Sequence, residues 1–163
     1  MWYNFQVDIY SFLDQHQIAY QRFDHPAVFT CEEAEKCPQM PGKGTKNLLL
    51  RDRDGKRHFL VVVGHEKQVD LKALKDMLGV SKLSFASPER LKKYLDVEPG
   101  SVTLLGVVND ADHGVEVVID EALWGQSLQC HPLVNTATLV LPHEGIEKFL
   151  NATHTLFRSL KVP

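Results

Sequence analysis

A chain of 163 residues is long enough for one compact domain with its own apolar core and too short for two such domains. Its apolar fraction of 44% and charged fraction of 24% are those of an ordinary globular protein, and no segment is apolar over the length that crosses a bilayer. Three cysteines without a C-x-x-C pair disfavour a disulfide scaffold or a zinc ribbon, and the N-terminus lacks a signal-peptide pattern, so a cytoplasmic protein is expected.

In chain order, the N-terminal part alternates helices with extended segments. Apolar periodicity and capping residues predict helices over 7–18, 31–37, 70–78 and 87–95. Apolar runs and turn residues predict extended segments over 21–30, 46–52, 58–64 and 82–86. The pair Asp54-Gly55 is typical of a β-hairpin and joins the segments 46–52 and 58–64.

The C-terminal part is predicted to be mostly β. Strands are expected over 103–109, 115–123 and 133–141, followed by a helix over 143–153 and an edge strand over 156–162. No linker or repeat divides the chain. The sequence therefore predicts a single α+β domain over residues 1–163, with a mixed, mostly antiparallel sheet that curls like a barrel and is flanked by helices.

Charge is distributed unevenly along the chain, although the net charge is only −3. Residues 43–93 hold 13 of the 18 Lys and Arg residues against 6 acidic residues, whereas residues 94–147 hold 9 acidic residues and no Lys or Arg. Such asymmetry indicates either a face that prefers polyanions or a set of solvated helix faces.

The segment "GTKNLLLRD" places Lys46 and Asn47 at the start of a core strand, where an unpaired ammonium is costly to bury. His65 follows the next strand and is either functional or a hydrogen-bonded turn residue. His131 precedes Pro132, which holds its backbone extended. Cys130 is disfavoured as a nucleophile, because neighbouring side chains on an extended segment point to opposite faces and Cys130 cannot contact His131.

The sequence lacks the motifs of metal sites, serine hydrolases and nucleotide-binding sites. The histidines show no H-E-x-x-H or H-x-x-x-H spacing, so no metal site is expected. The sequence contains no G-x-S-x-G elbow, no Walker motif and no dinucleotide-binding glycine pattern. We therefore expect no metal and no cofactor, and the remaining candidates are a lysine, small polar groups and a histidine-proline turn.

Five segments carry a resemblance to a known family: "GTKNLLLRD", "FLVVVGHEKQVDLKAL", "LGVSKLSFASPERLKKYL", "EPGSVTLLGVVND" and "CHPLVNTATLVL". Their order and spacing resemble the family that includes YbaK and the editing domain of bacterial prolyl-tRNA synthetases. Within it, the chain is most similar to the freestanding ProXp-ala (PrdX) branch, over about residues 5–155. The lysine-asparagine pair before a leucine strand and the late "GQSLQCHP" are the more specific motifs.

The resemblance implies an aminoacyl-tRNA deacylase that hydrolyses the ester of alanine on proline tRNA. It implies that Lys46, Asn47 and His131 are catalytic, although His131 could equally be a structural residue of the turn. It also implies that the reaction relies on a ribose hydroxyl of the substrate and a positioned water, without a protein nucleophile. The expected substrate-binding residues are Phe29, Thr45, Leu49, Val63, Gly64, His65, Gly125, Cys130, Pro132 and Val134.

The implied partners are aminoacylated tRNA(Pro) and, transiently, prolyl-tRNA synthetase, with no role for DNA or a membrane. The basic stretch from Lys43 to Lys93, including Arg51, Arg53 and Arg57, is the expected RNA face. Alanine offers no side-chain group for a hydrogen bond, so a site that accepts it must reject proline by volume. The alternatives are a deacylase for cysteine or serine on the same tRNA, a non-catalytic tRNA-binding module, and a metal or thiol hydrolase.

Overall fold

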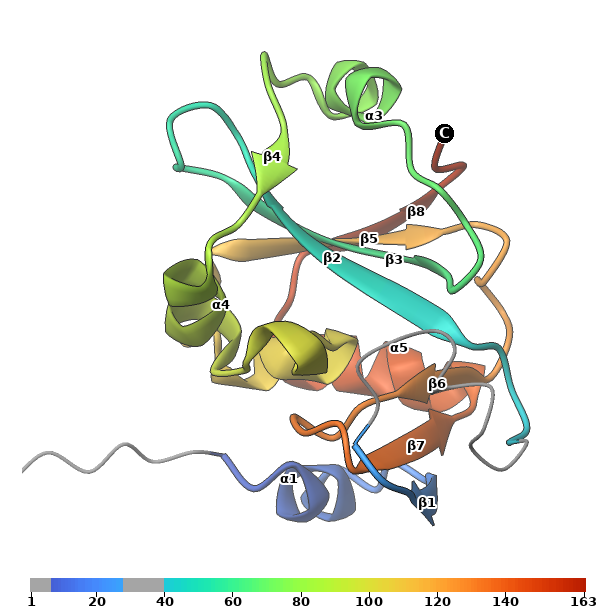
Figure 1. Cartoon of the computed structure of the whole chain (residues 1–163). Coiled ribbons are helices and arrows are strands. Elements are labelled where there is room, and N and C mark those ends of the chain that lie inside the picture. The colour runs from blue at the N-terminus through green and yellow to red at the C-terminus, as the bar shows by residue number, and fades with distance from the viewer. Residues whose placement is uncertain (1–6, 28–39) are drawn as a thin grey trace, which may run out of the picture.

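The computed structural model describes residues 7–27 and 40–163. The helix expected over 31–37 and the expected pocket residue Phe29 lie outside these described residues. Within them the chain forms one mixed α+β arrangement of two sheets and several short helices (Figure 1).

The larger sheet has five strands in the order β4-β2-β3-β5-β8. Its strands are β2 (Thr45–Arg51), β3 (His58–Gly64), β4 (Ser84–Phe85), β5 (Val115–Asp120) and β8 (Phe157–Leu160). β2 pairs antiparallel with β3 and β4, whereas β3–β5 and β5–β8 are parallel. Because Thr45 pairs with Gly64, the beginning of β2 lies beside the end of β3.

The smaller sheet has three antiparallel strands in the order β1-β7-β6. They are β1 (Gln21–Asp24), β6 (Leu128–Cys130) and β7 (Ala137–Leu141). An isolated bridge between Lys43 and Leu128 connects the approach to β2 with β6. In Figure 1 the small sheet lies below the large one, near the beginning of β2.

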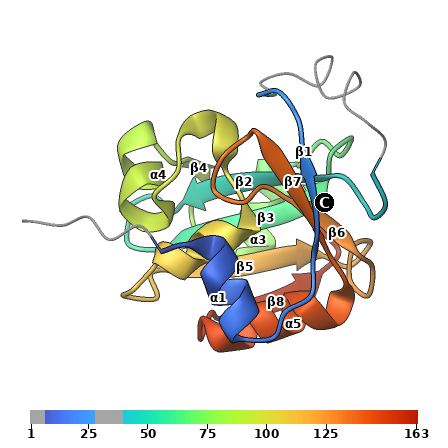
Figure 2. The same cartoon turned by 90° about the horizontal axis from the view of Figure 1, so that it is seen from below.

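The helices lie on both sides of the large sheet. They are α1 (Ile9–Gln15), α3 (Leu71–Leu78), α4 (Pro88–Leu95), α5 (His143–Ala152) and two 3₁₀ segments, η1 (Pro99–Ser101) and η2 (Leu104–Asn109). Figure 1 shows α3 on one side of the large sheet and α4, α5 and the small sheet on the other; Figure 2, from below, shows α1 and α5 beside the small sheet.

Two apolar cores follow from this arrangement, one on each face of the large sheet. On the α3 side, Leu50 and Val63 pack with Leu74 of α3. On the other side, Leu49 packs in a larger core that includes Leu139 of the small sheet. Side chains alternate along a strand, so β2, β3, β5 and β8 each contribute to both cores.

Several local predictions are confirmed. Asp70 caps α3, which ends at Gly79 in the left-handed conformation, and Ser87 caps α4 with Pro88 in its first turn. The segments 46–52 and 58–64 form the expected hairpin as β2 and β3. The expected C-terminal strand is β8, and it lies at the edge of the large sheet.

Other predictions were wrong or too long. Residues 103–109 form no strand but the 3₁₀ segment η2, in which the Thr103 side chain accepts a hydrogen bond from the Leu105 N–H. A short buried apolar run is compatible with strand or helix, and contact with α4 decides here: a Cβ on Gly106 would lie 3.0 Å from Leu95 Cβ. The strand expected over 133–141 is confined to β7, and that over 115–123 to β5.

The barrel-like curl is not confirmed either. The strands form two separate sheets, so no closed barrel is present among the described residues. A barrel would need the two sheets to join. Instead, side chains of α4, α5 and η2 fill the larger core between them. No helix in the described part of the chain is both long and apolar enough to cross a bilayer.

Candidate active site

Lys46 and Asn47 are neighbours on β2 and point to opposite faces of the large sheet. Lys46 shares its face with Leu50, in the core beneath α3, and Asn47 shares its face with Leu49, in the core on the side of the small sheet. The two residues therefore cannot act on a substrate atom from the same direction unless one of them works through its backbone.

The ammonium of Lys46 is held by the turn that follows β3. Its Nζ donates a hydrogen bond to the main-chain carbonyl of Lys67. The turn is closed by a hydrogen bond from the Lys67 N–H to the Gly64 carbonyl at 2.9 Å, and the His65 N–H donates to the Gly44 carbonyl at 3.1 Å. Lys46 forms no ion pair within residues 7–27 and 40–163, so no carboxylate there neutralises its charge.

The other face of the entrance to β2 is joined to β6. Thr45 donates through Oγ1 to the Gln129 carbonyl at 2.6 Å, and the Gln129 N–H donates to the Lys43 carbonyl at 2.9 Å. Asn47 lies on this face, and its buried Oδ1 has no hydrogen-bond partner in the part of the chain that the structure describes. A buried acceptor without a partner is uncommon in native structures and indicates a position where a ligand or water can bind.

His131 lies directly after β6 and is fixed from two sides. Its Nδ1 is 3.3 Å from the Ala137 carbonyl, and its own carbonyl accepts a hydrogen bond from Thr103 Oγ1 at 2.7 Å. A carbonyl only accepts, so Nδ1 donates and Nε2 is left as an acceptor in the neutral ring. Burial lowers the pKa of His131, which favours this neutral form at physiological pH.

Cys130 is not equipped as a nucleophile. Its side chain is buried in the larger core, and burial raises the pKa of its thiol to about 12. The reactive thiolate is therefore essentially absent at neutral pH. Cys130 therefore does not support the alternative of a thiol hydrolase.

The remaining expected pocket residues are dispersed. Leu49 and Val63 are buried in opposite cores, whereas Val134 is 49% exposed in the turn between β6 and β7. Gly64 and His65 lie beside Thr45, in the turn that holds Lys46. Pro132 is buried next to His131.

Gly125 lies in the turn before β6. It adopts a left-handed φ of 88°, and its N–H donates to His143 Nδ1 at the beginning of α5. A pocket of about 270 Å³ opens near this end of the molecule, and none of the expected residues lines it. Its lining residues are Ala19, Tyr20, Gln21, Ser127, Val140 and Pro142.

Three residues that sequence reasoning missed organise the site. Lys67 supplies the carbonyl that holds Lys46, Gln129 connects β6 to Thr45, and Thr103 holds the His131 backbone. Two of these contacts use main-chain carbonyls of the missed residues, which every residue type provides. No pattern of residue types could have identified these two main-chain contacts. The described residues contain no cluster of three or more His, Cys, Asp or Glu side chains arranged to hold a metal ion.

Comparisons with known proteins identify the family of the chain. The family model "Aminoacyl-tRNA editing domain" matches residues 25–149, a range that includes β2, β6 and His131. The prolyl-tRNA editing protein ProX of Acetoanaerobium sticklandii is 43% identical over 152 residues, 92% of this chain and 93% of that protein. The prolyl-tRNA synthetase associated domain-containing protein 1 of Danio rerio is 35% identical over 153 residues, 91% of this chain and 83% of that protein.

A solved structure described as a candidate trans-editing enzyme for prolyl-tRNA synthetase has the same fold. It superposes with a TM-score of 0.69 at 19% identity, over 96% of both chains. At that identity the likeness concerns the fold alone. The family model and the two relatives carry the assignment: the chain belongs to the aminoacyl-tRNA editing domain family.

Proposed function

We propose that the protein is an aminoacyl-tRNA deacylase that hydrolyses mischarged Ala-tRNA(Pro) in trans. The observation that carries the proposal is Lys46, whose ammonium lies at the entrance to β2 on a main-chain carbonyl and pairs with no carboxylate of the described residues. A substrate with a phosphate backbone and an ester carbonyl can use such a charge. The family and the names of the two relatives support the same reaction class.

The chemistry needs positioning more than a strong nucleophile, because an aminoacyl ester with a protonated α-amine is already reactive. We assign to Lys46 the binding of the terminal nucleotide or the polarisation of the ester carbonyl. A water oxygen bonds to the carbonyl carbon, and the bond from that carbon to the ribose oxygen breaks. The proton lost by the water ends on the ribose oxygen, so the products are alanine and uncharged tRNA.

The other two residues take supporting roles in this proposal. The Oδ1 of Asn47 has no hydrogen-bond partner among the described residues and lies on the face of the sheet opposite Lys46, so it can accept a hydrogen bond from a different part of the bound 3′ end, such as a ribose hydroxyl. Nε2 of the neutral His131 can accept a hydrogen bond from the ribose hydroxyl or the attacking water. We propose no protein nucleophile, metal or cofactor in the reaction.

Selection of alanine over proline must be a test of size. One or two methylene groups change simple binding by only about 1–3 kcal/mol, so strong rejection of proline requires its exclusion from the reactive pose. Such a pocket accepts any sufficiently small side chain, so cysteine and serine on the same tRNA are the alternatives that the chemistry leaves open.

The experiment that tests the function is a deacylation panel with Ala-, Ser-, Cys- and Pro-charged tRNA(Pro). We expect rapid release of alanine, release of serine at a comparable or lower rate, and almost none of proline. Preferential release of cysteine or serine would reassign the substrate. Binding of all four without hydrolysis would identify a tRNA-binding module, and equal hydrolysis of alanine and proline would contradict the size test.

The proposed partner is aminoacylated tRNA(Pro), with prolyl-tRNA synthetase as a transient neighbour in the cytoplasm. The synthetase releases the mischarged tRNA that this reaction consumes. Hydrolysis in trans then requires only that the free 3′ end reach the entrance to β2.

A further inference from the structure

A buried carboxylate lies behind the turn that holds Lys46. Asp120 is the last residue of β5 and is only 3% exposed. Its Oδ2 lies 3.6 Å from Lys67 Nζ, and its Oδ1 accepts the N–H groups of Ala122 and Val162 at 3.4 Å each. Burying a carboxylate is costly unless it is paired, so this position calls for an explanation.

The parallel pairing of β3 and β5 brings the two features together. Their carboxyl ends lie at the same edge of the large sheet, so the turn after Gly64 passes beside Asp120. Lys67 in that turn makes two contacts: its ammonium pairs with Asp120, and its main-chain carbonyl accepts the hydrogen bond from Lys46. One residue thus links the buried carboxylate to the proposed catalytic ammonium.

The C-terminal residues hold the same region from behind. Val162 is buried in the α3-side core, and its N–H donates to Asp120. The Asp70 N–H, at the other end of the loop from Gly64, donates to the Pro163 carbonyl at 3.0 Å. Asp120 therefore lies where β5, the turn and the C-terminal segment meet.

We propose that Asp120 is a positioning residue of the deacylation site, which acts through Lys67 to orient the Lys46 ammonium. The proposal rests on the function proposed above. A lysine side chain has several rotamers of similar energy, and the Lys67 carbonyl selects one of them. The ion pair fixes that carbonyl, because it anchors the Lys67 side chain in addition to the main-chain hydrogen bonds that join the turn to Gly64 and Gly44.

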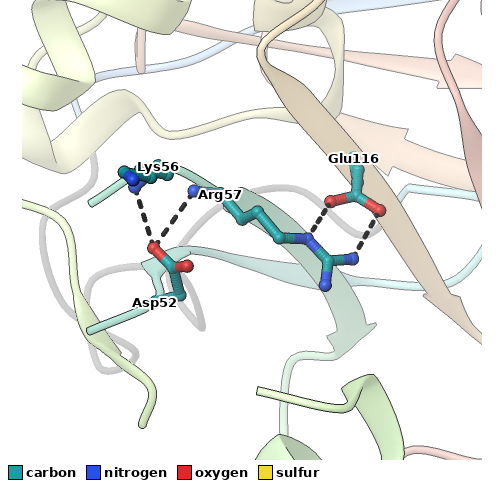
Figure 3. Close-up of polar contacts among 4 residues, drawn as sticks. All are labelled: Asp52, Lys56, Arg57 and Glu116. Atoms are coloured by element: carbon teal, nitrogen blue, oxygen red, sulfur yellow. Dashed lines mark hydrogen bonds and ion pairs between the residues drawn. The ribbon is translucent and has the colours of Figure 1, made fainter. Parts of the chain in front are cut away.

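The test compares the variants Asp120→Asn and Lys67→Met with a matched control. Asp120→Asn keeps an oxygen that can accept the N–H groups and removes the charge. The control is Glu116→Gln, which breaks a second ion pair on the same strand and the same face of β5. There Glu116 accepts two hydrogen bonds from Arg57, each of 3.0 Å, and Figure 3 shows this pair.

We expect Asp120→Asn to lower kcat for Ala-tRNA(Pro) about tenfold with KM nearly unchanged, because a small misplacement of a catalytic group costs up to about 100-fold. Lys67→Met should cost about the same, and Lys67→Arg should restore most of the rate. The double variant should be no slower than either single variant, since both act on one contact. Glu116→Gln should keep kcat within twofold.

A second readout does not depend on activity. In protein labelled with ¹³C- and ¹⁵N-lysine, the Cε–Nζ resonance of Lys46 should shift in Asp120→Asn and stay in place in Glu116→Gln. Wild-type kcat and an unmoved resonance in Asp120→Asn would overturn the proposal, as would losses that multiply in the double variant. If the wild-type protein hydrolysed none of the charged tRNAs, the function would fail while the lysine resonance still decided the positioning contact.

Discussion

At the scale of single residues, Lys46 carries the proposed chemistry. Replacing it by methionine keeps an unbranched side chain as far as the Cε position and removes the ammonium. We expect Lys46→Met to lower kcat/KM for Ala-tRNA(Pro) at least about tenfold, which corresponds to about 1.4 kcal/mol of barrier. The measurement is deacylation under single-turnover conditions.

The control for Lys46 is Lys72→Met, which removes an exposed ammonium from α3, on the same side of the large sheet. That variant should keep the wild-type rate. Equal rates in the two variants would show that Lys46 is merely another surface cation, although its ammonium is bound to the Lys67 carbonyl.

Cys130 tests whether the reaction uses a thiol nucleophile. Because burial raises the pKa of its thiol to about 12, we expect Cys130→Ala to retain kcat within about twofold. Iodoacetamide should leave the folded wild-type protein active and should label Cys130 only after denaturation. A loss of activity in Cys130→Ala without a loss of folded protein would restore the thiol mechanism.

At the scale of elements, the packing of α4 against β3 depends on a buried histidine. His58 is almost fully buried, its ring lies 4.1 Å from that of Tyr94, and Arg90 donates to its Nε2. Burial, with a smaller contribution from the Arg90 charge, lowers the pKa of His58 to about 4 from an ordinary value of 6.5. The neutral ring is therefore favoured in the folded state.

This pKa predicts how stability changes with pH. Between about pH 6.5 and pH 4 the unfolded chain binds a proton at His58 that the folded chain does not, so the free energy of unfolding falls as pH falls. The loss is at most about 1.4 kcal/mol per pH unit and roughly 3 kcal/mol in total.

Urea unfolding at a series of pH values measures this effect. The variant His58→Phe keeps a ring against Tyr94 and cannot titrate, so its stability should depend less steeply on pH between 6.5 and 4. The control His16→Phe removes an exposed histidine of the α1 end and should leave the slope unchanged. An identical slope in His58→Phe would assign the acid sensitivity to other groups.

At the scale of the whole molecule, the basic stretch is divided by the fold. The Arg57 side chain forms an ion pair with Glu116, whereas the hairpin cations Arg53 and Lys56 form no ion pair among the described residues (Figure 3). Arg53 and Lys56 are exposed in the β2–β3 hairpin, and Phe85, which pairs with Leu50 of β2, is 63% exposed on β4. Exposed cations and aromatic rings are typical of surfaces that bind nucleic acid.

The hairpin lies at the opposite end of β2 from Lys46, about 20 Å away for a strand of this length. A tRNA whose 3′ end enters at Lys46 could place its acceptor stem over that distance. We therefore expect the variant Arg53→Glu/Lys56→Glu to raise KM for Ala-tRNA(Pro) and to leave kcat unchanged.

Salt dependence distinguishes RNA contacts from loss of folding. Each lost phosphate contact should reduce the slope of log affinity against log salt by about 0.9. Charge reversal at Lys72 and Lys75 of α3 is the control, and it should leave both KM and the slope unchanged. The opposite result, with the effect confined to α3, would move the RNA face to that helix.

Much of the local structure could be predicted from the sequence, because the signals are contained in neighbouring residues. The Asp54-Gly55 turn between two apolar runs specifies the β2–β3 hairpin. The N-caps Asp70 and Ser87 mark the beginnings of α3 and α4. For the same reason the lysine-asparagine motif was visible at the entrance to a strand. The family resemblance was carried by such segments and is confirmed by the family model and the relatives.

Only the tertiary structure decided how these segments meet. From sequence alone, the apolar run of η2 is equally compatible with a strand, and its contact with α4 decides between the two. The strands form two separate sheets, and helices fill the core between them. The hold on Lys46 by Lys67, and on Lys67 by Asp120, joins residues far apart in the chain, in part through a main-chain atom. A sequence records residue types and their spacing along the chain, and it does not show which distant residues the fold brings into contact.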